Sequence, residues 1–193
     1  MGQDKWNRTM PNPIANLTTA RLLAEAITRS HYPDLHRLYT NPLVTKNLAS
    51  AGCKPLSDEK ITETISQAVE HWRRHGFGSW VFHLKKDGQF VGRGGLGSHQ
   101  FEGKEIVGLG YTIMPDYWNQ GFATEIAAAS LEVGFGHLGL AEIWSWALPD
   151  NLASQRVMEK LGFRYERDFA FAGLEHRFYR LVKGDWERYD GGG

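Results

Sequence analysis

Ile106–Phe135 reads IVGLGYTIMPDYWNQGFATEIAAASLEVGF, and this stretch predicts one strand, one tight turn and one helix. Its first part, Ile106–Met114, is apolar and rich in residues that favour strands. Within that part, Gly108 and Gly110 indicate a bulge or the close approach of another backbone. Pro115-Asp116 ends the strand, and the rest of the chain is organised around this unit.

The turn between this strand and the following helix has the features of an anion site. Asn119–Thr124, NQGFAT, runs directly into an alanine-rich helix. Such a turn directs several backbone N–H groups at one point, and the helix dipole adds positive potential there. The small residues Gly121 and Ala123 let a bulky group approach the main chain. The stretch therefore predicts a site best suited to a phosphate.

The bulk properties describe one globular domain. The chain has 193 residues, of which 41% are hydrophobic, and it contains seven tryptophans. Its 22 basic and 22 acidic residues give a formal net charge of zero, which argues against a general binder of nucleic acid or of a membrane surface. The single cysteine, Cys53, excludes an internal disulfide and a multi-cysteine metal site, and we expect no metal.

Targeting signals are not evident in the sequence. No apolar run approaches the roughly 20 residues of a membrane span. The N-terminal residues MGQDKWNRTMPNP lack the apolar region of a secretory signal. We therefore expect a cytoplasmic protein.

The segments before the central strand predict an antiparallel meander. Ser57 is a good N-cap for a helix, and Asp87-Gly88 is a strong hairpin signal between two strands. The second of these strands contains Gly92–Gly97, GRGGLG, which formally matches the dinucleotide fingerprint G-x-G-x-x-G. No helix opens there, so we interpret these glycines as part of a strand against which another element packs closely.

The segments after the central helix complete an α+β fold. Ile143–Leu148 predicts a fifth strand, residues 151–161 predict a helix, and Phe163–Phe169 with His176–Val182 predicts a closing hairpin. We expect a single domain with a mixed central sheet of about seven strands flanked by about four helices. Its expected limits are a loose N-terminal arm at 1–16, the domain at 17–183 and a C-terminal tail at 184–193.

Two motifs together resemble the GNAT-family N-acetyltransferases, most closely their ribosomal-protein alanine N-acetyltransferase branch. The turn Trp118–Ala123, WNQGFA, resembles the family's Gln/Arg-x-x-Gly-x-Gly/Ala turn, with Trp118 in place of the first basic or amide residue. The second motif, NLASQRVMEKLGF at Asn151–Phe163, resembles the family pattern at Asn151, Ser154, Gly162 and Phe163. The resemblance spans about residues 17–183.

The resemblance implies that acetyl-CoA lies in a gap between the central strand and the fifth strand. Its pantetheine arm would pair with the backbone of Tyr111 and Ile113, and Asn151 would reach the same arm. Ser154 would lie near the CoA sulfur and protonate the departing thiolate. The pyrophosphate would bind the backbone N–H groups of Asn119, Gln120, Gly121, Phe122, Ala123 and Thr124. From the residues alone, Asn151 and Ser154 are equally typical of an ordinary helix N-terminus.

Acetyl transfer to nitrogen requires a neutral amine. An α-amine has a pKa of about 7.7–8.0 and a lysine about 10.4, so an α-amine needs less help from a base. A bulged backbone N–H near Ile113 could stabilise the oxyanion. Relatives often carry a glutamate where this chain has Gly108, and Glu105 is three residues too early. His176 is the titratable group we choose as base, although it could equally be a rim residue, with water acting as the proton relay.

The sequence therefore predicts an acetyl-CoA-dependent N-acetyltransferase that moves the acetyl group directly to a primary amine in a ternary complex. The acceptor is a protein N-terminus or a small-molecule amine, bound near Leu35–Ser57 and Phe169–His176. Gly108 motivates the alternative, a catalytically inactive CoA-binding sensor or interaction module. We expect a monomer or homodimer with no nucleic-acid or membrane partner.

Overall fold

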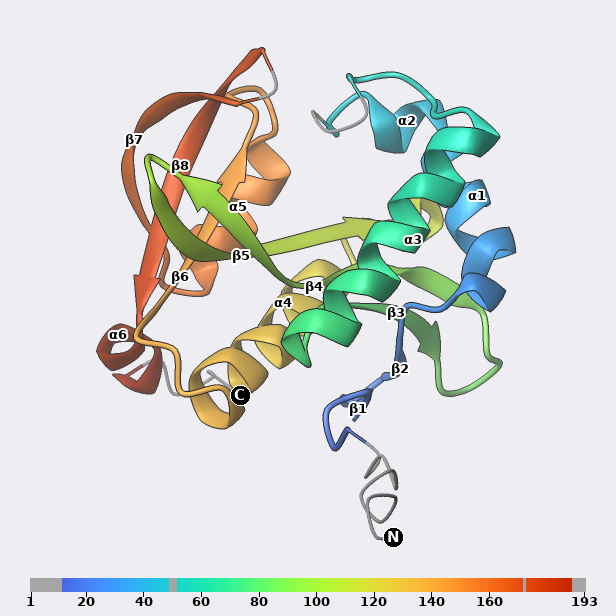
Figure 1. Ribbon diagram of the computed structural model, residues 1–193, viewed down its shortest axis with the longest axis horizontal. Helices are drawn as coiled ribbons and strands as arrows, with labels where there is room; N and C mark the ends of the chain where they lie inside the picture. Colours follow the sequence, from blue (N-terminus) through green and yellow to red (C-terminus); the bar gives the residue numbers. More distant parts are fainter. Residues whose placement is uncertain (1–11, 49–51, 172, 189–193) are drawn as a thin grey trace, which may run out of the picture.

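The computed structural model describes residues 12–48, 52–171 and 173–188. These residues form one eight-stranded sheet with the order β1-β2-β3-β4-β5-β6-β8-β7 (Figure 1). Every neighbouring pair is antiparallel except β5 and β6, which are parallel. The strands are β1 (Asn16–Thr18), β2 (Leu22–Ala26), β3 (Ser79–Leu84), β4 (Phe90–Phe101), β5 (Lys104–Ile113), β6 (Glu142–Ala147), β7 (Arg164–Phe171) and β8 (Leu174–Val182). The α+β fold with a mixed sheet is confirmed. The strand beyond the seven expected is β1, whose three residues are too few to show a period.

Helices cover both faces of the sheet, and side-chain alternation separates the two layers. On β3, Trp80 and Phe82 pack with α4, whereas Val81 packs with α1 and α3. In Figure 1, α3 lies over β3 and β4. Among the described residues no helix is both long and apolar enough to cross a bilayer. The α-helices are α1 (Tyr32–Thr40), α2 (Pro42–Thr45), α3 (Asp58–His75), α4 (Phe122–Glu132), α5 (Leu152–Lys160) and α6 (Lys183–Arg188).

Both ends of the described chain pack against the domain. Ile14, within the expected N-terminal arm, is 6% exposed, and its carbonyl accepts a hydrogen bond from Trp80 Nε1 at 2.9 Å. At the other end, α6 extends past residue 183, and Trp186 stacks on Phe135 with the ring centroids 6.2 Å apart. The packed region therefore includes residues from both flanks of the expected domain.

The glycine-rich segment of β4 lies under α4. A Cβ added at Gly94 would lie 2.3 Å from Cγ2 of Ile126 on α4, so only glycine allows the helix to approach this strand. The close approach expected at Gly92–Gly97 is confirmed, and the strand continues to Phe101 without opening a helix. The β4–β5 register runs unbroken from Gly92↔Ile113 to Phe101↔Lys104. The expected bulge near Ile113 is therefore wrong on this ladder.

The sheet is nearly divided between β5 and β6. Gly108↔Trp144 is the one pair that joins these strands among the described residues. One further bond crosses next to it, from Ser145 Oγ to the Leu109 carbonyl at 3.0 Å. Beyond this point the two strands splay apart, as expected, and a gap opens toward the C-terminal end of β5.

Candidate active site

The turn between β5 and α4 holds a row of backbone donors. A short 3-10 segment, Pro115–Tyr117, is followed by two left-handed residues, Asn119 with φ 59° and Gly121 with φ 79°. None of the backbone N–H groups of Asn119–Thr124 donates to another described residue. The last three belong to the first turn of α4, where no intrahelical acceptor exists. Such a concave run of donors at a helix N-terminus favours an anion.

Arg21, in the β1–β2 turn, braces this segment from behind. Its Nη1 donates to the Gln120 carbonyl at 2.8 Å, and its Nε pairs with Glu125 at 2.6 Å. Its guanidinium lies 3.9 Å from the centroid of the Phe122 ring. Burial alone would raise the pKa of Glu125, but bonds from Thr19 and Arg21 together with the Arg21 charge lower it. The turn is therefore fixed by an ionised pair that also places a positive charge beside it.

The β5 backbone points into the gap at alternate residues. Leu109 directs its carbonyl to Ser145 on β6, whereas Met114 directs its N–H to the opposite side, toward Val91 near β4. Odd-numbered residues of β5 therefore face the gap, and Tyr111 and Ile113 are in this set. Trp118 donates its indole N–H to the Ile113 carbonyl at 2.8 Å. The N–H of Ile113 thus stays directed at the gap while its carbonyl is already bonded.

A large cavity, about 530 Å³, runs from the turn along the gap. The sequence-predicted residues Tyr111, Ile113, Asn151 and Ser154 all line it. Arg156, exposed on α5, adds a positive charge to its wall. The turn contributes Asn119, Gly121, Phe122, Ala123 and Thr124, and Gln120 does not line it.

Tyr111 and Ser154 form a hydroxyl pair across the gap. The Tyr111 hydroxyl lies 3.0 Å from Ser154 Oγ and 3.1 Å from the Ser154 carbonyl. Burial raises the pKa of Tyr111 well above 10, so this phenol stays protonated at neutral pH. Asn151 caps α5 by accepting from the Ser154 N–H at 3.2 Å, while its Nδ2 bonds to none of the residues described. Asn151 and Ser154 therefore both stabilise the N-terminus of α5, and both also line the cavity with a polar side chain.

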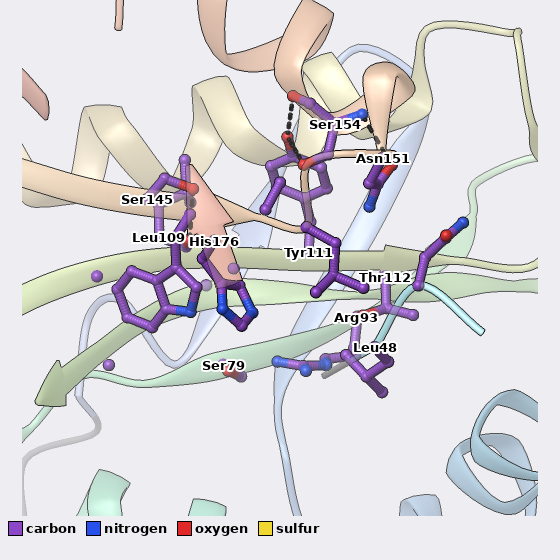
Figure 2. Close-up of a pocket in the computed structure, with 18 of the residues that line it drawn as sticks. Leu48, Ser79, Arg93, Leu109, Tyr111, Thr112, Ser145, Asn151, Ser154 and His176 are labelled. Carbon is purple, nitrogen blue, oxygen red and sulfur yellow. Dashed lines mark hydrogen bonds between the residues drawn. The ribbon is translucent and has the colours of Figure 1, made fainter. Parts of the chain in front are cut away.

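A small cavity, about 300 Å³, lies on the α1–α3 side of the same gap. Its floor is formed by four glycines without side chains: Gly95, Gly97, Gly108 and Gly110. The two cavities share six of the described lining residues: Asn47, Leu48, Tyr111, Thr112, Asn151 and Ser154. The Tyr111–Ser154 pair therefore lines both cavities. Figure 2 shows the hydrogen bonds between these two residues.

His176, on β8, lines the small cavity and is 2% exposed. Its Nδ1 lies 3.0 Å from the Leu174 carbonyl, which can only accept, so Nδ1 carries the proton and the lone pair is on Nε2. Burial lowers the pKa of His176. The ring is therefore neutral at pH 7, which is the form that a general base requires.

The space beside Gly108 is filled. A Cβ there would lie 2.9 Å from two ring carbons of Trp146 and 3.0 Å from Cδ2 of His99, whose ring meets the indole edge-on. A glutamate at this position would have to displace the indole. Glu105 lines neither cavity and accepts a hydrogen bond from Ser98. His99 also lines the small cavity, and burial lowers its pKa.

Other candidate chemistry is not supported at this site. No cluster of metal-ligating side chains occurs within residues 12–48, 52–171 and 173–188. Cys53 is partly buried and lines neither cavity. His71 is held on both ring nitrogens, by the Phe77 carbonyl at 2.8 Å and the Ser98 N–H at 3.0 Å, so its role is structural.

Residues 21–164 match the family model described as an acetyltransferase (GNAT) domain. This match covers more than half of the chain and includes the N–H turn and α5. The chain belongs to the GNAT acetyltransferase family. Solved structures that share the fold of this GNAT domain include complexes with CoA.

Relatives of this GNAT chain cover it to different extents. It is 30% identical to the Bacillus subtilis protein YkkB over 113 residues, which are 58% of this chain. The match spans 66% of YkkB, slightly less than two thirds of its length. It is 27% identical over 151 residues to Bacillus subtilis YoaA, which is named as an N-acetyltransferase, covering 78% of this chain and 83% of YoaA.

Two solved GNAT structures share the fold but differ in their named acceptors. Ribosomal-protein-S5-alanine acetyltransferase from Vibrio fischeri has a TM-score of 0.70 at 15% identity, covering 89% of this chain and 98% of that one. Spermidine N-acetyltransferase from Vibrio cholerae, solved with CoA and spermine, has a TM-score of 0.69 at 17% identity, covering 86% and 98%. Identities this low show the fold alone, so they do not assign the chain to the ribosomal-protein alanine N-acetyltransferase branch.

Several residues of this GNAT site have no signal in the sequence. Arg21 and Trp146 reach the site through contacts distant in the chain. Arg93 and Thr112, on β4 and β5, line the small cavity, and each has a buried polar atom without a hydrogen-bond partner among the described residues. For Arg93, the one feature of the sequence that could have indicated a role in the site is the presence of an arginine among the glycines of a buried strand.

Proposed function

We propose that this chain is an N-acetyltransferase that transfers the acetyl group of acetyl-CoA directly to a primary amine in a ternary complex. The observation that carries this proposal is the position of the Tyr111–Ser154 pair at the junction of two cavities. The large cavity leads to the N–H turn and suits the cofactor. The small cavity reaches the same junction from the opposite face and suits the acceptor.

The cofactor fits the groups that the large cavity offers. The pyrophosphate would bind the N–H groups of Asn119–Thr124, which have no partner among the described residues. The pantetheine arm would run along Tyr111 and Ile113, whose backbone faces the gap. Asn151 would contribute its Nδ2. Because Trp118 occupies the Ile113 carbonyl, we expect the arm to use the Ile113 N–H, or to displace the indole.

The transfer balances with the groups at the junction. Acetyl-CoA supplies an activated acyl group, the acceptor forms a new N–C bond and the C–S bond to CoA breaks. The amine loses a proton, for which the lone pair on His176 Nε2 is our candidate acceptor. The departing thiolate gains a proton from Ser154 Oγ, which takes one back from solvent, while Tyr111 donates to Ser154 and holds it in place. The Tyr111 phenol stays protonated, so it can hold this arrangement at neutral pH.

The acceptor we favour is an α-amine, either of a protein N-terminus or of a small molecule. Its ordinary pKa of about 7.7–8.0 leaves a useful neutral fraction at pH 7. This suits a site in which the indole of Trp146 fills the space beside Gly108 and leaves no room for a carboxylate there.

The cofactor site is tested by isothermal titration with acetyl-CoA. Gly121→Val should weaken binding about 10- to 100-fold, because it removes close approach to donors that make charge-assisted hydrogen bonds. Gly139→Val is the matched control, since Gly139 is also left-handed, at φ 65°, but has open space around it and lines neither cavity. Equal affinity in the Gly121 variant and the wild type would refute the site.

Activity is tested by thiol release from acetyl-CoA with a panel of amines and N-terminal peptides. Mass spectrometry of the products then locates the acetyl group. Acetylation confined to lysine side chains would overturn the preference for an α-amine. Tight CoA binding without turnover of any acceptor would instead support the binding-module alternative.

A further inference from the structure

Arg93 brings an unpaired charge to the floor of the small cavity. It lies on β4 directly opposite Thr112 on β5, so both side chains share one face of the sheet. Arg93 Nε and Thr112 Oγ1 are buried and bond to none of the described residues. The guanidinium forms no ion pair within the described chain, and its aromatic contact is the Tyr39 ring at 5.9 Å. Leaving buried polar atoms without partners is costly, and such a pair beside a cavity suits an incoming ligand.

The charge of the small cavity has one sign. No aspartate or glutamate is among the described residues that line it, and Arg93 is its one arginine or lysine. Figure 2 shows Arg93 and His176 reaching into the same hollow from β4 and β8. Because the one charged group among these described lining residues is a guanidinium, the cavity attracts anions and repels cations.

We propose that the acceptor is a primary amine that also carries a carboxylate, and that Arg93 binds this carboxylate with help from Thr112. This inference rests on the proposed function, because it takes the small cavity as the acceptor site. A guanidinium presents paired N–H donors that match the two oxygens of a carboxylate, and the Thr112 hydroxyl adds another donor. The chemical class is that of the amino acids.

The size and charge of the cavity favour this class over other amines. A volume of about 300 Å³ is at the lower end for small-molecule sites. A phosphate monoester carries about 1.5–2 negative charges and would call for more than one cation. A polyamine would bring several positive charges to a cavity that contains no carboxylate among its described lining residues. One arginine and one hydroxyl match a single carboxylate.

Arg93 would also act on the amine itself. A nearby positive charge disfavours the ammonium form of a bound amine and lowers its pKa. The carboxylate brings the substrate to Arg93, and the guanidinium offsets the negative charge that would otherwise favour the ammonium form of the amine. This assistance matters here because no carboxylate base stands at Gly108.

The test compares each of the twenty free amino acids with its carboxamide in the thiol-release assay. For wild type we expect kcat/KM to be at least about 30-fold higher for the preferred amino acid than for its amide, as for loss of one partner in a buried charge pair. Arg93→Met should abolish this preference by lowering only the amino-acid value. Arg93→Lys, which keeps the charge without the paired donors, should restore part of it. Arg37→Met, on the exposed surface of α1, is the control and should behave as wild type.

Peptides that begin with aspartate or asparagine form the second arm. If only the aspartate peptides are acetylated, in an Arg93-dependent way, the carboxylate comes from a side chain and the inference still holds. Unchanged acetyl-CoA affinity and melting temperature in Arg93→Met would show that the variant is folded.

A binding measurement separates this inference from the proposed function. N-acetylamino acids should bind the CoA-loaded wild type and lose affinity about 30-fold in Arg93→Met. If they do so while no acceptor is turned over, the proposed function fails, and the part of the inference that stands is the role of Arg93 as a carboxylate-binding residue. Turnover of amines without a carboxylate preference, or a preference that persists in Arg93→Met, would overturn the inference, as would an absence of both turnover and Arg93-dependent binding.

Discussion

Gly108→Ala should destabilise the protein, although Gly108 lies in a strand with an ordinary backbone conformation. The added methyl would lie 2.9 Å from Cη2 and Cζ3 of Trp146 and 3.0 Å from Cδ2 of His99, closer than carbon atoms pack. Overpacking of this kind costs about 1–3 kcal/mol, and the lower entropy of the unfolded chain offsets about 0.4–1 kcal/mol. We expect a net loss of about 1–2 kcal/mol, or a fall of roughly 2–8 °C in Tm.

Gly110→Ala is the matched control for this prediction. Gly110 lies on the same strand and face, but its added methyl would be 4.0 Å from its nearest neighbour, Arg93 Nη1. This variant should therefore show only the unfolded-state effect, with Tm unchanged or raised by roughly 1–4 °C. Differential scanning calorimetry of both variants measures the contrast directly.

A double-mutant cycle identifies the cause. If the Trp146 indole is the main obstacle to the methyl, Gly108→Ala should cost about 1 kcal/mol less in a Trp146→Leu background, where only the contact with His99 remains. An unchanged Tm for Gly108→Ala, or an equal loss in both backgrounds, would refute the reasoning. The indole would then not be what excludes a carboxylate at this position.

Three further predictions concern the proposed chemistry. Ser154→Ala should lower kcat about 10²–10⁴-fold with acetyl-CoA affinity nearly intact, and a loss below about 3-fold would argue against a proton-donor role. Burial lowers the pKa of His176, so kcat/KM measured with a single acceptor should rise with pH through a pKa below 6.5. This rise should be absent in His176→Gln. A rise that is unchanged in the variant would belong to ionisation of the substrate. Arg21→Gln should weaken acetyl-CoA binding about 10-fold by releasing the Gln120 carbonyl and the ion pair to Glu125, and calorimetric titration showing wild-type affinity would exclude this brace.

The elements of the fold could be predicted because their signals are local. The cap at Ser57, the glycines of β4 and the strand–turn–helix at Ile106–Phe135 depend on residues within a few positions of each other. The turn that we propose as the cofactor site has local signals of the same kind. A row of free N–H groups requires only the turn and the start of a helix, with glycine at the left-handed position.

The acceptor side could not be predicted, because it is made by contacts between distant residues. Trp146 fills the space beside Gly108 from another strand, and nothing near Gly108 in the chain indicates this. Arg93 and Thr112 become neighbours only through the register of β4 and β5. Trp118, which looked like a departure from the family turn, closes a hydrogen bond to Ile113. Periodicity reports which face is buried, but not which polar atom lacks a partner.

The single bridge between β5 and β6 has a mechanical consequence. The ladder between β4 and β5 has ten paired positions, whereas the two halves of the sheet meet at one. Their attachment comes mainly from an apolar cluster that includes Leu109, Leu131 and Ile143, contributed by β5, α4 and β6. Apolar packing is not directional, so small relative tilts of the halves break no ladder of hydrogen bonds. The sheet thus consists of two rigid halves joined mainly by apolar packing. A small motion that widens the gap between β5 and β6 should therefore cost little energy.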